Sequence, residues 1–268
     1  MESVFIDIAG GFVRMMKQIL LITDGCSNVG MDPVAAAANA ASEGIVVNVI
    51  GVVDEGEFGE RGEREVAEIA AAGGGMHRIV TPKELRRTMQ MMTRQTVTMT
   101  IRRMVSEELK SIAGDGDLHK LPPAKRSHVV QVIDDLSERA SLRVALLVDT
   151  SASMKPKLAA VEEAIRDLML SLEAREGESE LCVFVFPGKG GMAADAELLT
   201  DWTTELAKLN HLFYKLSMRG ATPTGPAIMS AVRHYRLEPS ARALNMTAEA
   251  ELPPGREESA GMLRDGCI

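Results

Sequence analysis

Apolar residues follow two patterns that alternate along the chain. Continuous apolar runs are typical of strands buried on both faces of a parallel sheet, and the stretches between them have the spacing of an amphipathic helix. The apolar runs predict strands at residues 18–22, 45–52, 77–80, 142–148, 181–186 and, as an edge strand, 196–202. The helical spacing predicts helices at residues 34–42, 63–72, 158–172, 206–216 and 226–235. This alternation favours an α/β fold built on a doubly wound, mostly parallel sheet.

The middle of the chain predicts a helical connector over residues 93–140. The spacing of Met89 and Met92 predicts a long helix that ends near Leu109, although residues 96–101 would suit a strand equally well. A linker containing glycine and proline follows, and then a second amphipathic helix.

Both ends of the chain lie outside this alternation. Residues 1–16 are short and interrupted by two glycines, so we expect an N-terminal extension there. Residues 237–268 are rich in alanine, glutamate and proline and lack an apolar period, so we expect a disordered tail.

Composition narrows the class of protein. The chain has 268 residues, 46% of them hydrophobic and 25% charged, which is enough apolar material for a globular core. Its 30 Lys and Arg against 38 Asp and Glu give a net charge of −8, so neither nucleic acid nor an anionic membrane surface is an expected partner. No apolar run reaches the length of about 18 residues that a membrane span needs. The 3 cysteines have no metal-ligand spacing and no secretory signal pattern precedes them, so we expect a cytoplasmic protein.

Oxygen-bearing side chains follow two of the predicted strands. Asp24 ends the first strand and Asp149 ends the fourth, with Ser151 and Ser153 in the next turn and Thr222 in a glycine-flanked loop at a helix start. Ligands of doubly wound sheets bind at the carboxyl ends of the strands, where the strand order reverses. Such hard oxygen ligands suit Mg²⁺ or Mn²⁺, whereas zinc would require His or Cys. Taken alone, a serine-rich turn after a strand is a helix cap about as often as it is part of a metal site.

Three motifs resemble the von Willebrand factor type A (VWA) domain. The run Asp149–Ser153 is similar to the DxSxS signature that opens the family's metal-ion-dependent adhesion site. Residues 222–227 resemble its TxTGxA-like loop, and residues 23–25 match its TDG motif. The resemblance implies a Rossmann-like sheet with the strand order 3-2-1-4-5-6. Within the family, the chain is most similar to uncharacterised intracellular VWA proteins of spore-forming bacteria.

The order of the motifs departs from the family's pattern. In the family DxSxS comes first and TDG last, whereas here the order is reversed, as in a circular permutation. Residues 17–92 would then form the C-terminal half of the domain and residues 141–236 the N-terminal half. The strands ending in Asp24 and Asp149 would be neighbours at the centre of the sheet. Alternatively, the two halves complete each other between two chains, so both a monomer and a swapped dimer remain open.

The resemblance implies a protein-binding module rather than an enzyme. By analogy with the family, Mg²⁺ or Mn²⁺ would be held by Asp149, Ser151, Ser153, Thr222 and Asp24. Its open position would take a Glu or Asp from a partner protein such as an AAA-type ATPase or a signalling enzyme. Two alternatives stay open: a Mg²⁺-dependent phosphohydrolase with Asp149 as nucleophile, and a metal-free dimeric scaffold. The phosphohydrolase reading rests on a likeness to haloacid dehalogenases, which have a second Asp where Ser151 stands.

Overall fold

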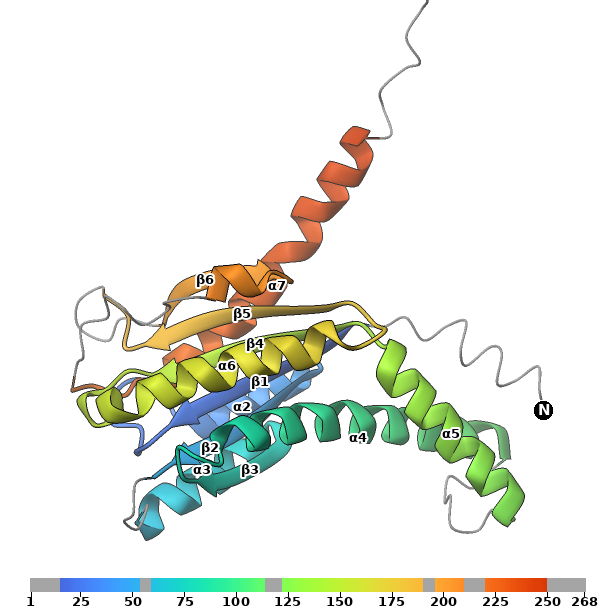
Figure 1. Ribbon diagram of the computed structural model, residues 1–268, viewed down its shortest axis with the longest axis horizontal. Coiled ribbons are helices and arrows are strands. Elements are labelled where there is room, and N and C mark those ends of the chain that lie inside the picture. Colours follow the sequence, from blue (N-terminus) through green and yellow to red (C-terminus); the bar gives the residue numbers. More distant parts are fainter. Residues whose placement is uncertain (1–14, 54–58, 114–121, 190–195, 210–219, 250–268) are drawn as a thin grey trace, which may run out of the picture. The chain divides into compact units, whose positions relative to one another are not determined.

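A computed structural model describes residues 15–53, 59–113, 122–189, 196–209 and 220–249 of the chain. Within these ranges the core is a six-stranded sheet with the strand order β3-β2-β1-β4-β5-β6 (Figure 1). The strands are β1 (Met16–Thr23), β2 (Ile45–Val52), β3 (Gly74–Val80), β4 (Leu142–Asp149), β5 (Ser179–Phe186) and β6 (Glu197–Thr203). The fold class predicted from the apolar runs is therefore confirmed.

The two central strands come from the two halves of the chain. β1 pairs with β2 on one side and with β4 on the other, both times in parallel, and Ile22 lies opposite Val148 in the β1–β4 register. β2–β3 and β4–β5 are also parallel, and the edge strand β6 is antiparallel to β5. Every residue of β4 is buried, as expected of a central strand with both faces covered. The expected adjacency of the strands before Asp24 and Asp149 is present within one chain.

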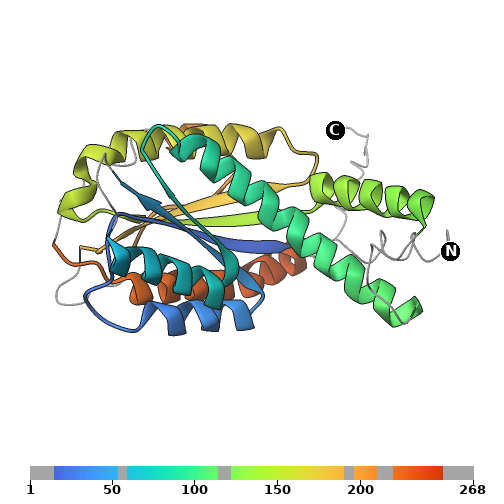
Figure 2. The ribbon, with the colours of Figure 1, turned by 90° about the horizontal axis from the view of Figure 1, so that it is seen from below.

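Helices cover both faces of the sheet (Figure 2). α4 and α6 lie on one face, and α2, α3 and the first turns of α7 lie on the other. The helices are α2 (Pro33–Ser42), α3 (Glu60–Ala72), α4 (Leu85–Ala113), α5 (Pro123–Arg139), α6 (Leu158–Glu173) and α7 (Thr224–Glu249), with 3₁₀ helices η2 (Ala152–Lys157) and η3 (Leu206–Leu209). α2 begins as its sequence predicts, because the Asp32 carboxylate accepts the Val34 N–H at 3.0 Å and Pro33 occupies the first turn. Of the expected helix 206–216, residues 206–209 form η3, and residues 210–216 lie outside the described ranges.

The helical connector is also part of the core. Residues 96–101, for which a strand was the alternative, lie inside α4. Ile101 of α4 and Ile133 of α5 belong to the same buried cluster as residues of β1 and β4. The two helices therefore do more than join the two halves of the sheet, because they bury apolar surface against it.

The chain divides into two compact units, residues 1–232 and 233–268. In the second unit the described residues are helical: α7 continues to Glu249, so the part of the expected tail at 237–249 is helix. The remainder of the tail, 250–268, and the extension at 1–14 lie outside the described residues. Of the helices that the structure describes, none combines the length and the apolar character needed to cross a membrane.

Candidate functional site

The candidate site lies where the two central strands end. Asp149 is the last residue of β4, and Asp24 directly follows Thr23, the last residue of β1. Because β1 and β4 are parallel neighbours, their carboxyl ends carry both aspartates to the same edge of the sheet.

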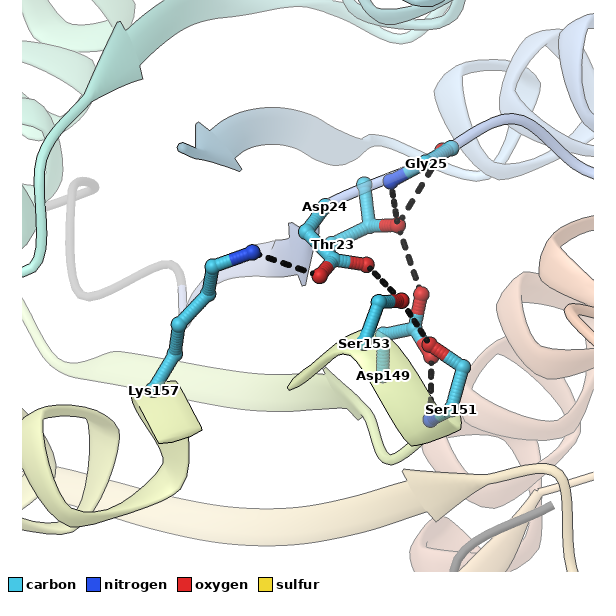
Figure 3. A network of polar contacts seen from close by, with 7 residues as sticks. All are labelled: Thr23, Asp24, Gly25, Asp149, Ser151, Ser153 and Lys157. Atoms are coloured by element: carbon cyan, nitrogen blue, oxygen red, sulfur yellow. Dashed lines mark hydrogen bonds and ion pairs between the residues drawn. The ribbon is translucent and has the colours of Figure 1, made fainter. Parts of the chain in front are cut away.

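A chain of hydrogen bonds joins the two aspartates (Figure 3). The Ser153 hydroxyl donates to Oδ1 of Asp24 at 2.9 Å, and the Ser151 and Ser153 hydroxyl oxygens are 3.2 Å apart. The Ser151 N–H donates to Oδ1 of Asp149 at 2.8 Å. Four of the five predicted ligands, Asp24, Asp149, Ser151 and Ser153, therefore lie in one network.

Asp149 is the most enclosed member of this network. The residue is 0% exposed, and its Oδ2 accepts the Thr23 hydroxyl at 2.8 Å. Burial raises the pKa of the Asp149 carboxyl from 3.8 to about 6, because desolvation disfavours the charged form. The hydrogen bonds from Ser151 and Thr23 oppose this rise, and the neighbouring charge of Asp24 adds to it. A cation bound nearby would offset the cost of keeping this buried carboxylate charged.

Thr222 reaches the same end of the sheet from the loop before α7. Its backbone N–H donates to Oδ1 of Asn28 at 2.8 Å, and its carbonyl accepts the Asn28 N–H at 3.3 Å and the Ser27 hydroxyl at 3.2 Å. The loop that follows Asp24 therefore holds the Thr222 backbone. The two loops pack so closely that a Cβ at Gly225 would lie 2.2 Å from the Met31 carbonyl oxygen, which explains the glycine there.

Glu65 of α3 also anchors the loop that follows Asp24. Its carboxylate accepts the Ser27 N–H at 2.6 Å. Partial burial raises the pKa of the Glu65 carboxyl, and this hydrogen bond counteracts the rise. No pattern in the sequence points to Glu65, since an acidic residue on an amphipathic helix gives no sign of a partner in a distant loop.

Lys157 is a second residue that the sequence analysis missed. Its ammonium is 2.7 Å from Oδ2 of Asp24, and the two side chains are only 7% and 3% exposed. Lys157 ends η2, the same short 3₁₀ helix that contains Ser153. A lysine in a proline-containing turn gives no pattern that distinguishes a buried ion pair from an exposed charge, so no sequence signal pointed to it.

The donor set at this site consists of oxygen atoms. Across the ranges that the structure describes, no three or more His, Cys, Asp or Glu side chains are grouped so that they could hold a metal ion. The network instead has two carboxylates and the hydroxyls of Ser151 and Ser153, with Thr222 in the adjoining loop. Such a set fits a hard divalent cation that retains water, such as Mg²⁺ or Mn²⁺, better than it fits zinc.

The fold and the site define a doubly wound α/β domain with a polar centre at the junction of its two middle strands. The chain belongs to the family of the uncharacterized protein YabS of Bacillus subtilis (strain 168). It is 46% identical to YabS over 230 residues, which cover 85% of this chain and 93% of that protein. The crystal structure of an uncharacterized protein from Alicyclobacillus acidocaldarius subsp. acidocaldarius DSM 446 superposes with a TM-score of 0.76 at 45% identity, covering 87% of this chain and 97% of that one.

No family model matches the chain. A far weaker likeness, with a TM-score of 0.24 and 16% identity, is to proximal thread matrix protein 1 of the mussel byssus with a zinc-occupied MIDAS motif. It covers 77% of this chain and 43% of that one. A similarity this weak gives no information about the site in this chain.

Proposed function

We propose that this chain is a circularly permuted VWA-type module that binds a divalent cation and thereby an acidic side chain of a partner protein. Asp149, Ser151, Ser153, Thr222 and Asp24 would hold Mg²⁺ or Mn²⁺, directly or through water. The observation that carries the proposal is the network from Asp24 through Ser153 and Ser151 to Asp149, which joins residues of both halves of the chain.

Three features of the chain support this proposal. The oxygen donors come from two strand ends and one helix-start loop, so they do not all follow one element of the chain. The Asp149 carboxylate is buried with hydrogen bonds to both of its oxygens, which fixes its orientation. The Asn28 and Ser27 contacts fix the Thr222 loop against the same edge of the sheet.

A bound cation would supply a positive charge with an open coordination position for a partner's Glu or Asp. The side chains of this module contribute the fixed frame around that position. Ser151 and Ser153 are held by one short 3₁₀ turn, so little ordering of the chain is needed when a cation and a partner bind.

The phosphohydrolase alternative needs Asp149 to attack a phosphorus atom. A nucleophilic carboxylate requires a free, approachable oxygen. Both oxygens of Asp149 accept hydrogen bonds and the residue is fully buried, which speaks against attack by either oxygen in this arrangement.

Calorimetric titration with MgCl₂ and MnCl₂ tests the proposal. We expect one binding site in the wild type, loss of binding in Asp149→Ala, and loss or at least about ten-fold weakening in Asp24→Ala, because each substitution removes a carboxylate ligand. Asp134→Ala is the matched control, since Asp134 is an exposed aspartate of α5.

Three outcomes contradict parts of the proposal. Absence of binding to either cation, both in the wild type and in Lys157→Met, rules out the cation-dependent module and favours the metal-free scaffold. Binding that survives Asp24→Ala unchanged removes Asp24 from the ligand set. Turnover of p-nitrophenyl phosphate that requires Mg²⁺ and disappears in Asp149→Asn establishes the phosphohydrolase instead.

A further inference from the structure

The buried ion pair between Lys157 and Asp24 sets this site apart from a simple cluster of oxygen ligands. The ammonium nitrogen of Lys157 lies 2.7 Å from Oδ2 of Asp24. At 7% and 3% exposure, water screens neither side chain well. Two charges this deeply buried stabilise each other, and removing one leaves the other at a large cost.

The two oxygens of Asp24 have different partners. Oδ1 accepts the Ser153 hydroxyl, on the side of the network that leads to Asp149, and Oδ2 faces Lys157. Figure 3 shows Lys157 reaching Asp24 from the side away from Ser151 and Asp149. The lysine therefore neutralises Asp24 without lying between the two aspartates.

The short 3₁₀ helix η2 carries both the Lys157 ammonium and the Ser153 hydroxyl of the network. Ser153 and Lys157 belong to η2, which is closed by the Met154 N–H donating to the Ser151 carbonyl at 3.0 Å. Lys157 is itself buried at the start of α6, so its position is fixed by the same turn that fixes Ser153. The ion pair is thus built into the site's own frame.

We propose that Lys157 is an internal competitor for the divalent cation, whose ammonium holds Asp24 and sets the cation concentration at which the site fills. This inference rests on the cation-binding function proposed above. An ammonium beside Asp24 cancels much of that carboxylate's attraction for a second cation and repels the cation directly. In the metal-free protein the same ammonium offsets the repulsion between the carboxylates of Asp24 and Asp149.

Substitution of Lys157 by an uncharged residue tests this role. Lys157→Met keeps an unbranched apolar stem and removes the charge, and Lys157→Gln also keeps a hydrogen-bond donor for Asp24. We expect both variants to bind Mg²⁺ about ten-fold or more tightly than the wild type in calorimetric titration, because a repelling charge is gone. Lys155→Met is the matched control, because Lys155 is an exposed residue of the same turn, and it should bind as the wild type does.

Thermal unfolding gives a second readout that does not depend on calorimetry. In EDTA, the Tm of Lys157→Met should fall below that of the wild type, because Asp24 is left buried and uncompensated. Addition of MgCl₂ should raise the Tm of Lys157→Met by more than it raises that of the wild type. Lys157→Arg keeps the positive charge and should behave as the wild type in both measurements.

The outcomes separate the two proposals. Wild-type binding with equal or weaker binding by Lys157→Met and Lys157→Gln overturns the competitor role and leaves the cation site standing. Absence of binding in the wild type and in both variants overturns both proposals. Binding by the variants alone supports the competitor role, and shows that the lysine keeps the wild-type site closed at the concentrations used.

Discussion

At the scale of single residues, the Asp149 carboxyl links the site to the stability of the metal-free protein. Its pKa of about 6 in the folded chain lies above the ordinary value of 3.8, so the folded state binds more protons than the unfolded state between these values. The free energy of unfolding should therefore fall as pH rises from about 4 to about 6, by about 3 kcal/mol from this residue.

Asp149→Asn checks this prediction, because an amide cannot ionise. In EDTA, urea unfolding of the wild type should show a lower free energy of unfolding at pH 7.5 than at pH 4.5, relative to Asp149→Asn measured under the same conditions. Asp134→Asn, at an exposed site, should follow the wild type. Parallel pH profiles for the wild type and Asp149→Asn would show that Asp149 does not carry the effect.

A second prediction at this scale concerns Asn28. Its side-chain oxygen accepts the Thr222 N–H, so Asn28→Ala leaves that donor without its partner. We expect a loss of about 0.5–1.5 kcal/mol in the free energy of unfolding, and weaker Mg²⁺ binding because the Thr222 loop is less firmly held. Asn39→Ala, on the exposed side of α2, is the control for both measurements. Equal cation affinity in Asn28→Ala and the wild type would separate Thr222 from the ligand set.

At the scale of elements, α4 acts as a core helix as well as a connection. Met89 is 0% exposed in the main buried cluster, whereas Met99 of the same helix is 57% exposed. Met89→Ala should lower the free energy of unfolding by about 2–5 kcal/mol through the cavity it leaves, and Met99→Ala should change it by less than about 0.5 kcal/mol. A loss from Met89→Ala as small as that from Met99→Ala would contradict the core role of α4. Urea denaturation measures both.

The same helix shows where sequence patterns are sufficient and where they are not. Strands β1, β2, β4 and β5 are predictable, because a buried parallel strand has no polar face that could blur its apolar run. The sequence of residues 96–101 suits a strand as well as a helix, since Thr alternates with apolar residues there. These residues form a helix because that helix packs against the sheet. The proximity of Asp24, Asp149, Ser151 and Ser153 is predictable, because these motif residues follow the ends of neighbouring strands. Lys157 was missed, because its partner is 133 positions away in the chain and the local turn has no matching signal.

At the scale of the whole molecule, one chain supplies both halves of the candidate site. The Thr23 hydroxyl and the Asp149 carboxylate meet within the chain although 126 positions separate them. A mixture of Asp24→Ala and Asp149→Ala chains should therefore bind Mg²⁺ no more tightly than Asp24→Ala does alone, even after the two are unfolded and refolded together. Recovery of binding in the mixture, with the mass of a dimer, would show that the halves are exchanged between chains.

The long separation between β1 and β4 also has a consequence for synthesis on the ribosome. β1 can pair with β2 soon after both emerge, but its other edge has no partner until β4 has been made. At translation rates of about 5–20 residues per second, the 126 positions between Thr23 and Asp149 correspond to roughly 6–25 s. For that time a nascent chain carries an apolar strand with one bare edge, which is the kind of surface that recruits other strands. Chaperone occupancy of the growing chain should be greatest in this interval and fall once residue 149 has left the exit tunnel.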